Sequence, residues 1–493
     1  MGDSLIFGIN FLSGLFVICI GLGVIAVIYM YITDIRQHKH AIRHNYPVIG
    51  RFRYLFEKQG EFFRQYFFAM DREEMPFNRA ERSWVYKAAK NVDRTLAFGS
   101  TRSLDPTGTI MFMNCAFPTL EEDAVAPAPI TIGENCRTPY TTSSIFNISG
   151  MSYGAISKPA VRALSRGAKL AGCWMNTGEG GLSPYHLEGQ ADIVFQIGTA
   201  KYGVRDEQGK LSKEKLVELA KHPEVKMFEI KISQGAKPGK GGILPGRKVT
   251  KEIAKIRGIE EGQDSISPNG HPDIRSVGDL LDMINFIREA TGKPVGFKSV
   301  IGSLNWFDDL LNEIGKRGPQ SAPDFITIDS ADGGTGAAPQ PLMDYVGLPL
   351  KESLPLVVSR LDAHQLKPRI KIIASGKLIT PSKVAWAIAL GADFVVSARG
   401  HMFALGCIQA LQCNKDTCPT GITTHNKRLQ QGLDVEDKTI RVANYNKYIH
   451  YGLGLIAHSC GVNNARHLDK SHIRIVTENG LSVALEKLYE HHQ

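Results

Sequence analysis

The sequence is poor in cysteine, with 8 in 493 residues, and these are neither dense nor evenly spaced. This scarcity excludes the disulfide scaffold of a small secreted domain. Internal repeats and low-complexity tracts are also absent. Hydrophobic residues make up 43% of the chain, which is too many for a disordered protein. The length permits one large α/β barrel with attachments, or two to three smaller domains.

Charged residues are absent from residues 4–33, where Leu, Ile, Val, Phe and Gly dominate. The stretch exceeds the roughly 20 residues that cross a bilayer as a helix. We therefore predict a transmembrane helix over residues 1–33. A cleaved signal peptide is the alternative, but its basic residues should precede the apolar run and its apolar core should be shorter.

Acidic residues are absent from residues 35–56, which instead carry several basic ones. These are Arg36, Lys39, Arg43, Arg51 and Arg53. By the positive-inside rule, this cluster predicts a single-pass membrane protein whose large C-terminal part is cytoplasmic. The net charge of +9 could instead suggest nucleic acid, but no aromatic platform or nucleic-acid module accompanies the cluster. We expect no nucleic-acid partner.

Residues 34–140 are predicted to form a helical neck and an irregular lead-in. Up to about residue 100, aromatic residues such as Phe62, Phe63, Tyr66 and Phe67 recur at helical spacing. This spacing indicates amphipathic helices that pack on the main domain.

Beyond the lead-in, short apolar segments alternate with glycine-rich turns and amphipathic helices. The segments are 145–149, 173–176, 193–197, 227–232, 295–300, 325–329, 370–374 and 393–397. The alternation predicts an α/β fold, a (β/α)8 TIM barrel over residues 141–430. An open sheet is less favoured because no dinucleotide glycine fingerprint opens the first helix. Residues 431–493 are predicted to be C-terminal helices that cover the barrel.

Most of the functional-looking runs directly follow these segments, where a barrel places its active site. They are 149–157, 176–181, 233–246, 266–274, 332–339 and 374–378. Glycines there let backbone amides approach a ligand, and those near Gly376 and Arg399 occupy the usual phosphate-binding corner. A phosphorylated cofactor fits. The alternative is that the glycines only form turns, which would explain any one of these loops but explains six at one end of the barrel poorly.

Lys298 lies near the end of the fifth strand segment. A cation pointing into the barrel is costly unless it faces a ligand, and reduced flavin supplies negative charge. A lysine that reaches solvent at the strand end is the alternative.

Three cysteines, Cys407, Cys413 and Cys418, lie within one stretch of twelve residues after the last strand segment. Iron–sulfur ligation is the natural use of three thiolates in one loop. Zinc would need a fourth ligand, for which His401 or His425 is a candidate, and three plain thiols are the remaining alternative.

Several runs together resemble the synthase domain of glutamate synthase, and especially its short, membrane-anchored relatives. They are SGMSYGAIS, NTGEGG, QGAKPGKGG, DGGTGA and the three-cysteine run, in that order, and the resemblance covers residues 145–430. It implies FMN and a 3Fe–4S cluster held by the three cysteines. The expected flavin-binding residues are Gly150, Met151, Ser152, Thr177, Gln196, Lys298, Asp332, Gly333, Gly334, Ser375, Gly376, Ala398 and Arg399.

The resemblance also implies a reaction. Electrons would enter at the cluster, pass to FMN and reduce the imine of 2-oxoglutarate and ammonia to glutamate. The family's carboxylate-binding lysine and arginine fall on Lys237 and Arg257. Glu179 is expected to be a proton relay, or else a carboxylate that caps its loop.

Departures from the long enzymes define further expectations. The chain is expected to lack their glutaminase and pyridine-nucleotide domains, so a separate donor, ferredoxin-like or a reductase subunit, would supply electrons. Ile243 stands where they carry a substrate-binding glutamine, and Leu182 where they usually have an acid. Two alternatives follow: a flavin oxidoreductase or isomerase with another substrate, or a non-catalytic membrane electron-transfer subunit.

Overall fold

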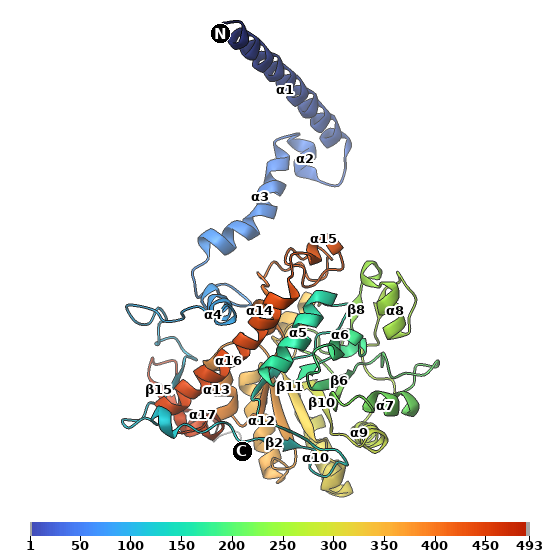
Figure 1. Cartoon of the computed structure of the whole chain (residues 1–493), viewed down its shortest axis with the longest axis vertical. Coiled ribbons are helices and arrows are strands. Elements are labelled where there is room, and N and C mark those ends of the chain that lie inside the picture. Colours follow the sequence, from blue (N-terminus) through green and yellow to red (C-terminus); the bar gives the residue numbers. More distant parts are fainter. Residues whose placement is uncertain (1, 490–493) are drawn as a thin grey trace. The chain divides into compact units, whose positions relative to one another are not determined.

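The structure, a computed structural model, describes residues 2–489 and divides into two compact units, Met1–Ala80 and Glu81–Gln493. Figure 1 shows the path of the chain and the labels used below. Residue 1 and residues 490–493, the outer ends of the predicted anchor and C-terminal segment, lie outside the described residues.

The first unit is helical, as expected for an anchor and neck. It contains α1 (Gly2–Arg36), α2 (Ala41–Asn45), α3 (Gly50–Phe63) and a π-helical turn, η1 (Arg64–Phe68). Within α1, Leu5–Arg36 is long and apolar enough to cross a membrane and is not buried. α4 (Arg79–Ala89) begins where this unit ends.

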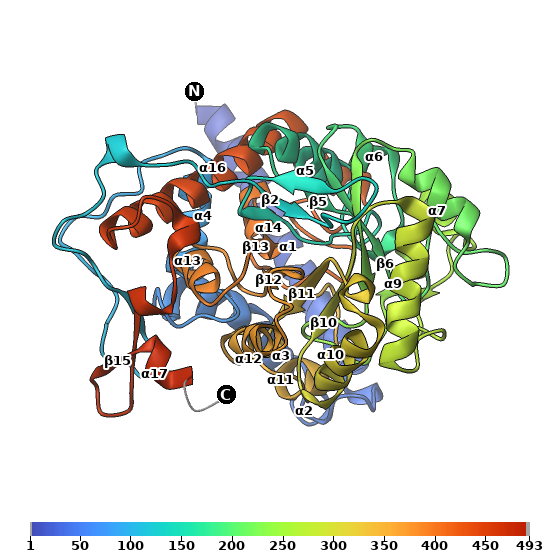
Figure 2. The ribbon, with the colours of Figure 1, turned by 90° about the horizontal axis from the view of Figure 1, so that it is seen from below.

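The second unit contains a closed barrel of eight parallel strands, which confirms the predicted fold. Around the barrel the order is β10-β11-β12-β13-β4-β5-β6-β7, and Figure 2 views most of these strands from below. Each predicted segment forms one strand. The bounds are β4 Phe146–Ile148, β5 Met175–Asn176, β6 Ile193–Ile197, β7 Val225–Lys231, β10 Val295–Val300, β11 Phe325–Asp329, β12 Lys371–Ser375 and β13 Phe394–Ser397.

Helices alternate with the strands and are bounded by local signals. At the start of α5 (Lys158–Ala171), Ser157 accepts a hydrogen bond from the Ala160 amide, and Gly172 ends the helix with φ of 66°. The other helices are α6 Pro184–Leu187, α7 Lys213–Ala220, α8 Lys251–Arg257, α9 Val277–Thr291, α10 Asn305–Arg317, α11 Gln340–Tyr345, α12 Leu350–Ala363, α13 Pro381–Ala389, α14 Arg399–Leu405, α15 Lys427–Gln430, α16 Val435–Ser459 and α17 Leu485–Tyr489.

A hairpin of β2 (Ile130–Ile132) and β3 (Tyr140–Thr142) packs at the end of the barrel where the strands begin. Ile132 and Tyr140 belong to the same buried cluster as Trp174, and the Tyr140 hydroxyl donates to Asp192 Oδ2 at 2.9 Å. Because this end is filled, the carboxyl ends of the strands are left for a binding site.

The C-terminal segment differs from the prediction of helices alone. It contains α16 and α17, but also β14 (Ile473–Val476) and β15 (Ser482–Ala484), which pair antiparallel. β14 also pairs with β1 (Ile110–Phe112), and β1 to β3 all lie at least partly within the lead-in expected to be irregular. These strands have only three or four residues, and β1 pairs with a strand more than 350 residues along the chain, so local patterns did not reveal them.

Candidate active site

The predicted flavin-binding residues gather at the carboxyl ends of the barrel strands. Each lies near the end of a strand or just beyond it: Gly150, Met151 and Ser152 after β4, Thr177 after β5, Gln196 in β6, Lys298 in β10, Asp332 to Gly334 after β11, Ser375 and Gly376 at the end of β12, and Ala398 and Arg399 after β13. The fold therefore brings this set together. Their contact with a flavin stays a prediction.

A buried carboxylate, Glu229, lies among these residues on β7 and is 3% exposed. Its Oε1 accepts hydrogen bonds from Asn176 Nδ2 at 2.8 Å and Gln196 Nε2 at 2.7 Å. Its Oε2 accepts one from Thr327 Oγ1 at 2.6 Å. Four strands are thus tied together by one carboxylate, which sequence reasoning missed.

Lys298 points to a partner within the protein. Its Nζ lies 3.2 Å from Asp329 Oδ2, and Asp329 also accepts from the Gly235 amide at 2.9 Å and the Ser375 hydroxyl at 2.7 Å. Burial lowers the pKa of Lys298, but Asp329 and Glu229 outweigh it and raise the pKa overall. Lys298 is therefore protonated, and its burial alone does not require a ligand.

The expected phosphate corner is shaped by close backbone approaches. Gly376 has φ of 128°, and a Cβ there would lie 2.3 Å from Ser330 Cβ. Arg399 Nη2 donates to the Asp332 carbonyl at 3.3 Å, and Lys377 Nζ lies 2.9 Å from Asp332 Oδ2. Two cations, Arg399 and Lys377, thus lie close to Gly376, which has no side chain to cover the backbone. Such a corner fits a phosphate.

Glu179, which follows β5, lies in a narrow slot between two glycines. A Cβ on Gly198 would lie 2.8 Å from its Oε2, and one on Gly242 would lie 2.5 Å from its Oε1. Lys231 Nζ contacts Oε2 at 3.0 Å. Burial raises the pKa of Glu179, but Lys231, Lys237 and Arg257 outweigh it and lower the pKa. Glu179 is therefore a carboxylate at neutral pH.

Lys237 and Arg257, the expected carboxylate-binding pair, are buried beside Glu179 and 7% and 5% exposed. Burial, and then the charge of Lys231, lower the pKa of Lys237 to about 8. Arg257 donates to Ser265 Oγ at 3.2 Å and lies 5.2 Å from the Tyr202 ring centroid. Its Nε has no hydrogen-bond partner among residues 2–489, so this buried cation has an unused donor.

Helix α8, which carries Arg257, is held by a second carboxylate. Glu252 accepts hydrogen bonds from Tyr153 at 2.7 Å and from Tyr185 at 2.6 Å. Tyr153 lies in the SGMSYGAIS run, so this contact links the helix that carries Arg257 to a loop expected to bind flavin.

The two positions that differ from the long enzymes lie near Glu179. Ile243 starts the two-residue strand β8 (Ile243–Leu244), which pairs with β9 (Ser265–Ile266), and it is 47% exposed. It directly follows Gly242, which abuts the Glu179 carboxylate. Leu182 is partly buried.

The three cysteines follow α14 in one loop, and none forms a disulfide. Burial raises the pKa of the Cys407 thiol to about 12, and Cys413 and Cys418 add to the rise because they lie nearby. The Gln409 amide lies 3.5 Å from Cys407 Sγ, and Thr420 Oγ1 lies 3.3 Å from Cys418 Sγ. The donor set, three thiols in one loop with polar neighbours, suits a cluster.

No group of three or more His, Cys, Asp or Glu side chains in the described chain is arranged to hold a single metal ion. The two histidines considered above as zinc ligands lie in other surroundings: the His401 ring stacks on Phe146 with centroids 5.2 Å apart, and His425 Nε2 lies 2.8 Å from the Gly154 carbonyl. The structure gives the zinc alternative no support.

Lys248, which sequence reasoning also missed, ties the cysteine loop to the barrel. It is 2% exposed, and its Nζ donates to three carbonyls: Thr423 at 2.8 Å, Ala155 at 3.2 Å and Cys413 at 3.4 Å. Ala155 belongs to the SGMSYGAIS run. The expected flavin loop and the cysteine loop are therefore joined through one ammonium group.

Comparison with known proteins gives consistent matches. Residues 109–463 match the conserved region in glutamate synthase. The glutamate synthase large subunit-like protein YerD of Bacillus subtilis is 40% identical in an alignment of 508 positions, gaps included, that covers 95% of this chain and 96% of YerD.

Two further relatives are longer than the region that matches. The archaeal glutamate synthase (NADPH) of Methanocaldococcus jannaschii is 39% identical over 65% of this chain and 60% of its own length. The glutamate synthase (NADPH) large chain of Bacillus subtilis is 32% identical over 58% of this chain and 18% of its own length. Similarity to these parts does not by itself carry over what the whole proteins do.

Proposed function

The chain belongs to the glutamate synthase family of oxidoreductases, and on that premise we propose that it converts a 2-oxo acid and ammonia to an amino acid. The reaction consumes two electrons and two protons and releases water. 2-Oxoglutarate, giving glutamate, is the expected substrate. The electrons come from a separate donor protein.

One observation carries this proposal: the charge balance of the side chains that surround Glu179. Lys231, Lys237 and Arg257 surround a single carboxylate, and three cations less one anion leave an excess of two positive charges. A dicarboxylic 2-oxo acid carries two negative charges. Arg257 also keeps an unused Nε donor within the described residues, and a buried donor without a partner is costly unless a ligand fills it.

FMN, when bound, would supply the two-electron reduction. The residues that fit it are those of the phosphate corner, Gly376, Lys377 and Arg399, together with Lys298. Lys298 holds a positive charge near the expected flavin ring, while Gly376 leaves the backbone open to the phosphate.

The chain's own residues would bind the substrate and move a proton. Lys237 and Arg257 pair with the substrate carboxylates and fix the position of the 2-oxo carbon. Because Glu179 is ionised, it acts as a base: it accepts a proton from ammonium or from the amine as the imine forms. Lys231 stabilises that carboxylate at 3.0 Å.

A 3Fe–4S cluster, when bound, would pass single electrons toward the flavin. Cys407, Cys413 and Cys418 would hold it, and Lys248 would keep their loop against the flavin loop. In the cell, α1 would anchor the protein with its barrel in the cytoplasm, since the basic residues follow the apolar span.

The test is incorporation of labelled nitrogen. The purified, chemically reduced protein should convert ¹⁵N-ammonium and 2-oxoglutarate to ¹⁵N-glutamate, seen by mass spectrometry. Iron analysis and electron paramagnetic resonance of the protein before reduction, when a 3Fe–4S cluster would be oxidised and paramagnetic, test the cluster, and Cys413→Ser should remove its signal while flavin remains. A wild-type sample without flavin would instead favour the non-catalytic electron-transfer subunit.

A further inference from the structure

Helix α3 and the turn after it carry an apolar stripe that is left uncovered in the described residues. We define this aromatic stripe as Phe52, Leu55, Phe56, Phe62, Phe63 and Phe67, each at least 43% exposed. Within α3 the members recur at spacings of three, four and seven residues, so they share one face of the helix. Exposed apolar patches of this kind mark interaction surfaces.

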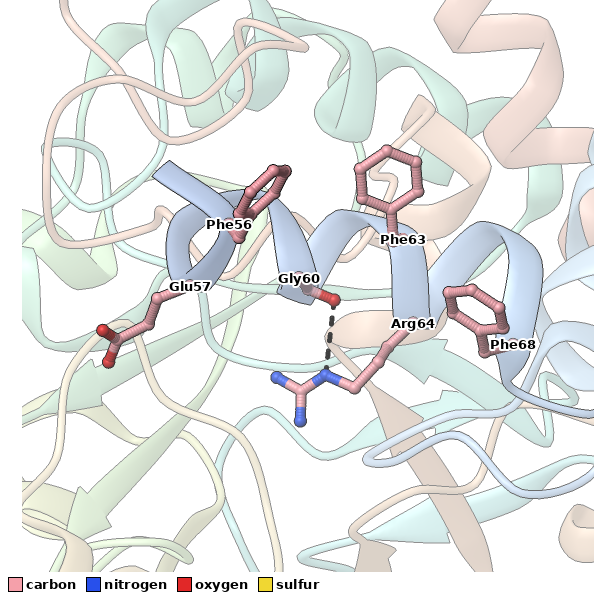
Figure 3. A pocket seen from close by; sticks show the side chains of 6 residues that line it. All are labelled: Phe56, Glu57, Gly60, Phe63, Arg64 and Phe68. Atoms are coloured by element: carbon pink, nitrogen blue, oxygen red, sulfur yellow. Dashed lines mark hydrogen bonds between the residues drawn. The ribbon is translucent and has the colours of Figure 1, made fainter. Parts of the chain in front are cut away.

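The opposite face of α3 is charged. In Figure 3, Phe56 and Phe63 rise from one side of the helix, whereas Glu57 and Arg64 extend from the other. The Arg64 guanidinium folds back along the helix, with its Nε 3.4 Å from the Gly60 carbonyl. The helix is therefore amphipathic, and its two faces prefer different surroundings.

The start of α3 is fastened to the end of the apolar span. Asp34, in the last turn of α1, is fully buried. Arg51, in the first turn of α3, donates to Asp34 Oδ2 at 2.7 Å and to Thr33 Oγ1 at 2.9 Å. Arg43 adds a second bridge to Asp34 at 2.7 Å. The stripe consequently begins at the depth at which a membrane-spanning α1 would leave the hydrocarbon.

We propose that α3 lies in the headgroup layer of the membrane, with its aromatic stripe in lipid and its charged face toward water. The inference rests on the proposed anchoring by α1. A helix of this type buries its apolar face roughly 5–10 Å into the interface. Arg43 and Arg51 share the single carboxylate of Asp34, while Arg36 and Lys39 add further positive charge and no acid occurs among residues 35–56; this positive excess matches an anionic lipid surface.

Lipid is preferred to other occupants because of this continuity. The clamp at Asp34 joins the stripe to the span within one unit. An anionic lipid surface balances the positive charge that remains at the junction after Asp34 pairs with Arg43 and Arg51. The other occupants are a second copy of the chain and the barrel, on which the sequence led us to expect the neck to pack. Both are outcomes of the test below.

The test uses the full chain in vesicles of phosphatidylcholine and phosphatidylglycerol, with and without lipids brominated near the headgroup. Phe56→Trp places a fluorophore on the stripe, and Glu61→Trp places one on the charged face as the matched control. The unchanged chain, with its native tryptophans, supplies the background. Bromolipid should quench the Phe56→Trp signal clearly more than the Glu61→Trp signal, and Phe67→Trp should behave like Phe56→Trp.

Each other result contradicts the inference in a recognisable way. Equal quenching at both positions in protein that floats with the vesicles would overturn it and leave the anchor intact. Blue-shifted emission of Phe56→Trp without quenching would place the stripe on protein, and chemical cross-linking would then separate a second copy from the barrel. If the protein does not float with the vesicles, α1 does not anchor it in the membrane, and the inference loses its basis.

Discussion

Two regions depart from the usual distribution of side chains in opposite ways. One is the aromatic stripe, and the other is the barrel mouth, by which we mean the side chains at the carboxyl ends of the barrel strands. The mouth buries charges: Lys298, Asp329 and Glu229 are all below 10% exposed, and each has polar or ionic partners. The stripe exposes large apolar side chains, and its ring contacts, Phe52–Phe56, Phe62–Tyr66 and Phe63–Phe67, run along the same helical segment. Charged groups are seldom buried unless paired, and apolar patches are seldom exposed unless they bind something.

This difference indicates in which region a substitution should reduce the stability of the fold. In the barrel mouth, removal of one charged side chain leaves its ion-pair partner buried and unpaired. On the stripe, removal of one group changes little in the fold, because nothing there depends on it. Four changes, in order of decreasing effect, test this contrast.

The largest effect is expected from Lys298→Met. It leaves Asp329 and Glu229 buried without their shared cation, and breaking a buried pair costs about 3–5 kcal/mol. The midpoint of barrel unfolding in urea should fall strongly. Lys298→Arg keeps the charge and should lose much less. If Lys298→Met unfolds at the wild-type midpoint, the charges in the mouth are not energetically coupled.

Arg257→Ala should come next. Charge-assisted hydrogen bonds contribute about 1.5–3 kcal/mol, so kcat/KM for a dicarboxylic 2-oxo acid should fall by one to two orders of magnitude. Steady-state kinetics and flavin content should be measured together, since the flavin should be retained. Arg257→Lys is the matched control. Unchanged kinetics with every 2-oxo acid would remove the arginine from substrate binding.

A pH dependence of intermediate size is expected from Lys237, whose pKa is lowered to about 8 by burial and by Lys231. Only the protonated amine pairs with a carboxylate. kcat/KM should therefore be level below about pH 8 and fall by up to tenfold per pH unit above it. In Lys237→Arg this fall should disappear. A fall that persists in the arginine variant would assign the titration to another group.

The smallest effect is expected from charges placed on the stripe. Phe56→Glu with Phe63→Glu should change the free energy of unfolding of the barrel by no more than about 0.5 kcal/mol, as for surface positions in general. The flavin content should also be unchanged. A large loss of barrel stability would show that the stripe packs on protein, and the two regions would then not differ in their sensitivity to substitution.

Much of this architecture is readable from the sequence because its signals are local. Each barrel strand is a short apolar run before glycine, and the runs at Gly150, Gly376 and the three cysteines lie at the carboxyl ends where a barrel places its site. Lys298 was found because a cation inside an apolar run stands out.

What the sequence did not reveal depends on distant partners. Glu229 interrupts an apolar run just as Lys298 does, so the same signal was present, but its role depends on three other strands. Lys248 follows a glycine and an arginine in an unremarkable loop, and only the fold brings three carbonyls to its amine. The pairing of β1 with β14 has no local trace at all.

Anaerobic reoxidation tests the central claim most directly. The purified, fully reduced protein is mixed with a panel of 2-oxo acids, with and without ammonium, and the flavin absorbance is followed. The account predicts bound flavin that is reoxidised fastest by a dicarboxylic 2-oxo acid and only when ammonium is present. Reoxidation that is indifferent to ammonium, or a preference for uncharged substrates, would contradict it.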